Sequence, residues 1–112
     1  MKDEILKLRR TTKETDISAE LKIYGRGECE IATGIGFFDH MLEALGKHSL
    51  INLKIACKGD THVDFHHSVE DVGIALGALL KEAIYPVSAV ERFADCVVTM
   101  DEAAVSCALD LS

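Results

Sequence analysis

The sequence predicts an α+β fold in which a mixed β-sheet carries two helices packed on one face. Three observations favour this class: short stretches alternate apolar and polar residues, two longer stretches repeat apolar residues at helical spacing, and the two patterns are interleaved. We expect the order strand, strand, strand, helix, strand, helix, strand, strand. The 112 residues are 48% hydrophobic, which is enough for the core of one domain.

The first part of the chain predicts three strands and a helix. Residues 4–13 alternate loosely, and residues 16–24 alternate clearly. The Gly-Arg-Gly sequence at 25–27 predicts a turn that joins the second strand to a hairpin partner over 29–35. Apolar residues at helical spacing then predict a helix over 37–47.

The second part predicts one long helix among strands. Residues 51–57 return to alternation, and residues 66–84 have the apolar spacing of a long amphipathic helix. Two more strands are expected at 93–100 and 104–111. Because the sequence stops inside this last alternating stretch, we expect it to be part of a longer protein.

Charge and composition exclude several classes of function. The chain has 12 Lys and Arg against 19 Asp and Glu, a net charge of −7, so it has no general attraction for nucleic acid or anionic membranes. No apolar run approaches the roughly 18 residues of a membrane span, and the charged start does not resemble a signal peptide. We expect a cytoplasmic protein with no nucleic-acid or membrane partner. The four cysteines form no Cys-x-x-Cys pair, and we expect buried free thiols.

The histidines suggest a metal site. On a helix that begins near residue 66, His66 and Glu70 are four residues apart and lie on one face, where they can bind one ion. His67 points about 100° away and has the same spacing to Asp71. Mixed imidazole and carboxylate ligands fit Mn²⁺, Fe²⁺ or Zn²⁺. The alternative is that Asp64 caps the helix and the histidines are simply solvated.

Three other residues have ordinary interpretations when each is taken alone. His40 fits a hydrogen-bonded histidine on an apolar helix, Glu14 an exposed carboxylate in a turn, and Arg92 a surface charge before a strand.

Taken together, these segments resemble the imidazoleglycerol-phosphate dehydratase family of histidine biosynthesis. The resemblance covers nearly the whole chain, in family order: R-x-T-x-E-T at 10–15, ATGIGFFDHML at 32–42, HSLINL at 48–53, DFHHSVEDVGIALG at 64–77 and ERFADCVVTMDEA at 91–103.

The resemblance implies a fold of two tandem β-α-β halves, similar to ribosomal protein S5 domain 2. Residues 1–90 would be the first half, with the histidine-rich metal motif, and residues 91–112 the truncated start of the second. It also implies a hydro-lyase that converts imidazole glycerol phosphate to imidazole acetol phosphate. Its partners would be this small phosphate substrate and other copies of itself, in a homo-oligomer of 24 subunits.

The resemblance further implies residue roles and a cofactor. Family members bind two Mn²⁺ ions per site, and the ligand positions that match here are His40, His66, His67 and Glu70. Glu14 and Glu70 match catalytic carboxylates that can move protons, and the glutamate that Glu14 matches is contributed at the subunit boundary. Substrate-binding positions are matched by Glu14, His40, His48, His66, His67, Glu70 and Arg92, with Arg92 near the phosphate.

Departures from the family pattern keep other interpretations open. Phe65 stands where many relatives carry an acid, and the second His-His-x-x-Glu motif is absent from these residues. The alternatives are an inactive fragment or a non-catalytic domain for metal binding or assembly, and a different metallohydrolase that uses the same cluster. The intact set of four ligand positions favours the dehydratase.

Overall fold

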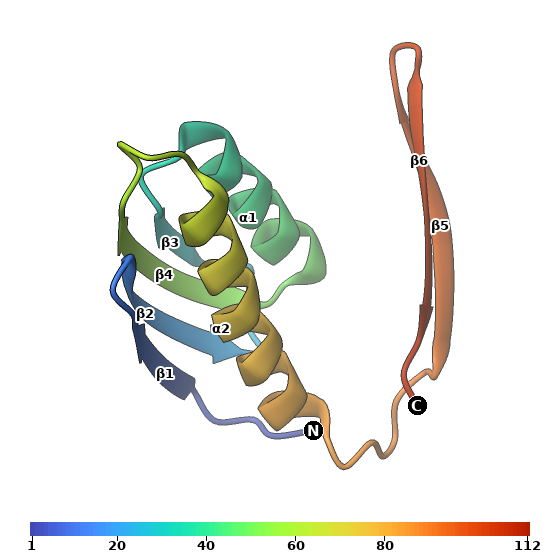
Figure 1. Ribbon diagram of the computed structural model, residues 1–112. Helices are drawn as coiled ribbons and strands as arrows, with labels where there is room; N and C mark the ends of the chain where they lie inside the picture. Colours follow the sequence, from blue (N-terminus) through green and yellow to red (C-terminus); the bar gives the residue numbers. More distant parts are fainter.

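The computed structural model describes residues 1–112 and has the predicted order of elements (Figure 1). The elements are β1 (Leu6–Thr11), β2 (Thr15–Lys22), β3 (Cys29–Ala32), α1 (Gly36–Ser49), β4 (Asn52–Gly59), α2 (His66–Ile84), β5 (Phe93–Met100) and β6 (Ala103–Asp110).

A four-stranded mixed sheet with the strand order β1-β2-β4-β3 forms the first layer. β1 and β4 both pair antiparallel with β2, and β3 pairs parallel with β4. One side of the sheet carries charges that face each other across neighbouring strands. Lys7 lies opposite Glu20 and bonds it at 2.8 Å, and Lys54 lies opposite Glu20 on the other side. This face is therefore the solvent side.

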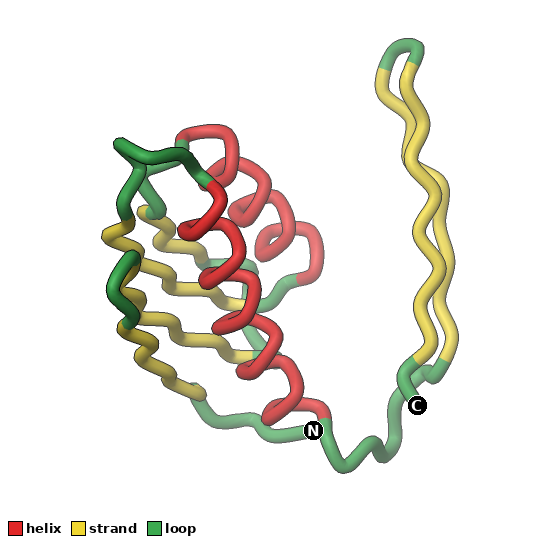
Figure 2. Tube along the Cα trace, viewed as in Figure 1, coloured by secondary structure: helices red, strands yellow, loops and turns green.

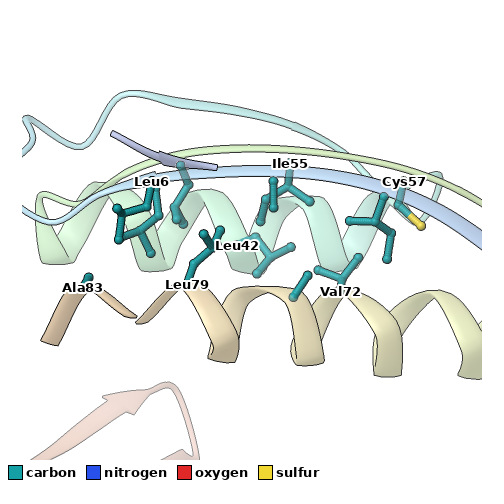
Figure 3. Close-up of a cluster of buried hydrophobic side chains, with 12 residues drawn as sticks. Leu6, Leu42, Ile55, Cys57, Val72, Leu79 and Ala83 are labelled. Carbon is teal, nitrogen blue, oxygen red and sulfur yellow. The ribbon is translucent and has the colours of Figure 1, made fainter. Parts of the chain in front are cut away.

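Both helices cover the other side of the sheet, so the predicted α+β arrangement is present (Figure 2). α2 packs across β1, β2 and β4, while α1 packs on β3 and β4. The core between the layers contains Ile17 and Ile55 from the sheet and Val72 and Leu79 from α2, all at most 2% exposed (Figure 3). We call residues 6–84 the helix–sheet layer.

The predicted hairpin between residues 16–24 and 29–35 is wrong. β3 is a short edge strand that pairs parallel with β4 and makes no pair with β2. Two parallel neighbours need a crossover connection, and α1 supplies it between β3 and β4. Gly34, at φ 82°, adopts the left-handed conformation that favours glycine where the chain leaves β3 for α1.

The β5–β6 hairpin (residues 93–110) lies apart from the helix–sheet layer (Figure 1). The register places only apolar residues on one of its faces, including the facing pairs Val98–Val105 and Cys96–Cys107. All of its residues are exposed. The expectation of buried thiols is therefore wrong for Cys96 and Cys107, because nothing in these residues covers that face. Cys29 is half-buried and Cys57 is buried, and all four cysteines are free, as expected.

The helices also keep an apolar surface on the side away from the sheet. On α1, Phe37, Met41 and Leu45 are exposed at helical spacing, and on α2 Val69 and Ile74 are exposed. Neither helix is both long enough and apolar enough to cross a membrane.

Candidate functional site

The loops at one edge of the sheet bring together most of the residues that the sequence singled out. β1 ends and β2 begins there, and Thr15 at the start of β2 pairs with Gly59 at the end of β4. Because β3 runs parallel to β4, its end lies at the same edge, so α1 and α2 both begin there (Figure 1). This edge therefore carries the turn with Glu14, the start of α1 and the start of α2.

The first turn of α2 carries one histidine–carboxylate pair. His66 Nε2 lies 2.9 Å from Glu70 Oε2, as the four-residue spacing predicted. Both side chains are more than half exposed, and they line a shallow depression together with Phe65 and Val69. Asp64 accepts a hydrogen bond from the backbone N–H of His66 at 2.9 Å, but the N-cap residue of α2 is Phe65, which makes no side-chain cap bond. The Asp64 bond at the helix start and the His66–Glu70 pair therefore occur together.

His67 forms a second pair, with Asp60 and not with Asp71. Its Nδ1 lies 2.7 Å from Asp60 Oδ2, in the loop that follows β4. The two histidine rings are nearly perpendicular, with centroids 5.7 Å apart. Since the carboxylate occupies Nδ1, Nε2 is the nitrogen of His67 that remains for another ligand.

Glu14 places its charge beside this second pair. The hydrogen bond to Asp60 raises the pKa of His67 above its usual value, and the charges of Glu14 and Asp64 raise it further. The backbone also joins the two regions, because the Asp60 N–H donates to the Glu14 carbonyl at 3.0 Å. The Glu14 side chain itself is exposed and makes no hydrogen bond.

His40 lies near the start of α1, at the same edge of the sheet, and is exposed. Its neighbour Asp39 accepts a hydrogen bond from the buried Thr33 N–H at 2.8 Å and another from the Thr33 hydroxyl. These bonds fix the turn that enters α1. Asp39 thus holds the helix start and makes no hydrogen bond to the His40 ring.

His48 and Arg92 are not brought to this edge. His48 is eight residues beyond His40 on α1, about 12 Å along the helix axis. Arg92 follows the far end of α2, and its guanidinium bonds Asp110 at 2.7 Å and lies over the Phe93 ring. Within this chain, His48 and Arg92 are therefore not brought together with the candidate residues at this edge.

These residues do not form a complete metal shell by themselves. No group of three or more His, Cys, Asp or Glu side chains lies close enough to hold a metal ion. The chain presents two separate pairs, His66–Glu70 and His67–Asp60. The donor types fit a divalent cation such as Mn²⁺, but the number of donors does not.

Sequence reasoning missed Asp60, and it assigned Asp71 the wrong partner. Asp60 follows Gly59 directly after β4, and such a position at a strand end is the only local signal for it. Asp71 is buried and accepts a hydrogen bond from Thr15 Oγ1 at 2.6 Å, across 56 residues of sequence. No periodicity within a helix or strand could indicate that contact.

Residues 33–112 match the model of the family described as imidazoleglycerol-phosphate dehydratase. Curated relatives with that name include one from Campylobacter curvus, 82% identical over all 112 residues, and one from Helicobacter hepaticus, 56% identical over 112 residues. The matched residues are 57% and 55% of the length of those two relatives. The chain thus spans little more than half of the proteins it resembles.

Solved structures give the same result for the fold. The imidazoleglycerol-phosphate dehydratase of Staphylococcus aureus superposes with a TM-score of 0.83 at 31% identity, over 97% of this chain and 58% of its own. The Pyrococcus furiosus protein, in complex with (S)-C348, gives 0.76 at 37% identity, over 92% of this chain and 53% of its own. These matches confirm the α+β fold class. The chain belongs to the imidazoleglycerol-phosphate dehydratase family.

Proposed function

We propose that a chain of full family length that contains this sequence dehydrates imidazole glycerol phosphate to imidazole acetol phosphate in histidine biosynthesis. We refer to it as the full-length chain. Membership of the family is the observation that carries this proposal. The gathering of Glu14, the two histidine–carboxylate pairs and the start of α1 at one edge of the sheet supports it, because those are the positions that match the family motifs.

We assign His40, His66, His67 and Glu70 as ligands of Mn²⁺, with two ions per site. Imidazole and carboxylate donors suit this ion, and these side chains are accessible to it because three are exposed and His67 is half-buried. Because the present residues supply no group of three donors, the remaining ligands come from outside them. When bound, the metal would act as a Lewis acid toward the imidazole ring of the substrate.

We assign proton transfer to Glu14, with Glu70 as a second carboxylate at the same edge of the sheet. Dehydration removes a proton from one carbon and a hydroxyl group from its neighbour, and a carboxylate can accept the first proton and protonate the departing hydroxyl. Glu14 suits this role because its carboxylate is exposed and is not held by any side chain. His48 and Arg92 bind substrate, with Arg92 at the phosphate, where binding energy is used for orientation.

The protein is further proposed to be a cytoplasmic homo-oligomer of 24 subunits that binds no nucleic acid and no membrane. Its charge of −7 is in keeping with the last two points. Residues 1–90 form the first half-domain and residues 91–112 begin the second. One observation favours the alternative for the 112 residues alone: without a group of three donors they would be an inactive fragment or a non-catalytic domain for metal binding or assembly.

Two carboxylate variants of the full-length chain test the assignment. Glu70→Gln should lower both metal content and turnover, because an anionic ligand becomes neutral. Glu14→Gln should retain the metal and lose about 10²–10⁴-fold in kcat, the usual contribution of a general acid or base. The measurements are metal analysis and a dehydration assay on the same samples.

Glu20→Gln is the matched control, since Glu20 lies on the solvent face of the sheet. It should leave both metal content and turnover unchanged. Full metal content and full rate in Glu70→Gln would remove Glu70 from the ligand set. Loss of metal in Glu14→Gln would show that the two roles are not separate.

A further inference from the structure

The turn that carries Glu14 has its own internal bonds but depends on other elements for its position. The Thr12 N–H donates to the Thr15 carbonyl at 2.8 Å. The Thr12 hydroxyl accepts from the backbone N–H groups of Glu14 at 3.2 Å and Thr15 at 3.1 Å. These bonds shape residues 12–15, and the exposed side chain of Glu14 makes no hydrogen bond of its own.

Asp71 on α2 ties this turn to the helix. Its Oδ2 accepts a hydrogen bond from Thr15 Oγ1 at 2.6 Å and a longer one from Thr12 Oγ1 at 3.5 Å, and its Oδ1 lies 3.4 Å from Arg10 Nη2. Asp71 is only 8% exposed. The hydrogen bond from Thr15, with the charge of Arg10, holds the pKa of Asp71 below its usual value. We call Asp71, Arg10, Thr12 and Thr15 the Asp71 cluster.

Burying a carboxylate costs free energy of folding unless its hydrogen bonds compensate for the water that it loses. The buried carboxylate of Asp71 between α2 and the turn therefore points to a role for its hydrogen bonds. A core position at this point of an amphipathic helix would ordinarily hold an apolar residue. Position 71 also directly follows Glu70 and lies one helical turn beyond His67. A bond from the turn to Asp71 therefore fixes the turn relative to both histidine–carboxylate pairs.

A second contact, with Asp60, also fixes the position of the turn that carries Glu14. The Asp60 N–H holds the Glu14 carbonyl at 3.0 Å, while the Asp60 carboxylate holds His67 at 2.7 Å. The turn is thus fixed from two sides, by α2 through Asp71 and by the end of β4 through Asp60.

We infer that Asp71 is a positioning residue for Glu14: through Thr15 and Thr12 it holds the turn against α2 and sets where the Glu14 carboxylate lies relative to His67 and Glu70. In this role Asp71 acts through Glu14, because its own bonds go to Thr15, Thr12 and Arg10. The inference rests on the proposed function, which gives Glu14 its role in proton transfer.

The main test is Thr15→Val in the full-length chain, because valine keeps the shape of threonine and removes the hydroxyl that Asp71 binds. We expect kcat to fall by about 100-fold, the scale of a misplacement of about 1 Å, with KM and metal content close to wild type. Thr15→Ser keeps the hydroxyl and should restore kcat. Thr11→Val is the matched control, since the Thr11 hydroxyl bonds Asp16 at 3.1 Å and lies outside the Asp71 cluster.

The double variant that combines Thr15→Val with Glu14→Gln separates an effect on the position of Glu14 from an effect on the stability of the whole protein. If Asp71 acts through Glu14, Thr15→Val causes no further loss of kcat in the Glu14→Gln background. A loss of the same size in both backgrounds would overturn the inference. So would a kcat of Thr15→Val equal to that of Thr11→Val.

Hydrogen exchange supplies a measurement that does not depend on activity. In Thr15→Val, and in Asp71→Asn as a second variant, the amides of Glu14 and Thr15 should exchange about tenfold faster while those of β4 keep wild-type rates. Unchanged exchange at both amides would overturn the inference even if the protein is a dehydratase. If the wild-type full-length chain shows no dehydration, the proposed function fails, and the exchange rates still decide whether Asp71 holds the turn.

Discussion

In the helix–sheet layer the apolar side of each strand faces a helix, whereas in the β5–β6 hairpin the apolar side faces nothing within these residues. Both regions have strands of alternating or apolar sequence, and the pattern alone does not distinguish them. Ile17 and Ile55 in the layer are at most 2% exposed, while Val105 in the hairpin is 68% exposed. The difference teaches that alternation predicts a strand and its inward face, but burial depends on which element covers that face.

The largest expected difference between the two regions is the cost of removing apolar side chains. Leu79→Ala in α2 should lower the free energy of unfolding by about 2–5 kcal/mol, because Leu79 is 0% exposed and its loss leaves a cavity. Val105→Ala in the hairpin should change it by no more than about 0.5 kcal/mol. Urea unfolding of the 112-residue chain measures both. Equal losses would show that the hairpin packs as well as the layer.

Two glycines make the next comparison, within the layer. A Cβ at Gly59 would collide with the buried Ser68 hydroxyl, so Gly59→Ala should cost about 1–3 kcal/mol. A Cβ at Gly77 on α2 meets nothing within 4 Å, so Gly77→Ala should gain about 0.5–1 kcal/mol from helix propensity. Thermal unfolding of the two variants gives opposite shifts in Tm. Shifts of the same sign would contradict the close approach of α2 to the end of β4.

The smallest effect concerns the charged face of the sheet. The hydrogen bond from Lys7, with the charge of Lys54, lowers the pKa of Glu20 below its usual value. A lowered pKa means that the ion pair stabilises the fold above the unfolded-state pKa and that this stabilisation disappears as the pH falls through the folded-state pKa. Because the pair is exposed, the change in stability should be slight.

A carboxyl NMR titration measures this effect directly. Lys7→Gln should return the Glu20 pKa toward its usual value, whereas Lys2→Gln, whose partner Glu82 lies on α2, should not. An unchanged Glu20 pKa in Lys7→Gln would mean that the pair does not form in solution.

The sequence predicts the local features of this molecule and not the contacts between distant segments. The His66–Glu70 pair follows from helical spacing, and the predicted helix over 66–84 is confirmed to the residue. The partner of β3 could not be predicted, because a glycine-rich turn after β2 fits a hairpin as well as a connection that leaves room for β4 between β2 and β3. Only the packing of α1 on β3 and β4 decides between them.

The candidate site shows the same limit. The pairing of His67 with Asp60 and of Asp71 with Thr15 depends on how the end of β4 and the start of β2 meet α2. Both contacts replace the His67–Asp71 pairing that helical spacing alone would favour. The roles of all the site residues remain predictions, since only the resemblance gives them: Glu14, His40, His48, His66, His67, Glu70 and Arg92.

The central claim is that these residues supply part of a dehydratase site and that the rest of a full-length family chain completes it. The most direct test compares the 112-residue chain with the full-length chain in a dehydration assay, each supplied with Mn²⁺ and with imidazole glycerol phosphate. We predict turnover by the full-length chain and none by the 112 residues, because the latter present no group of three metal donors. Measurable dehydration by the 112-residue chain alone would contradict the claim.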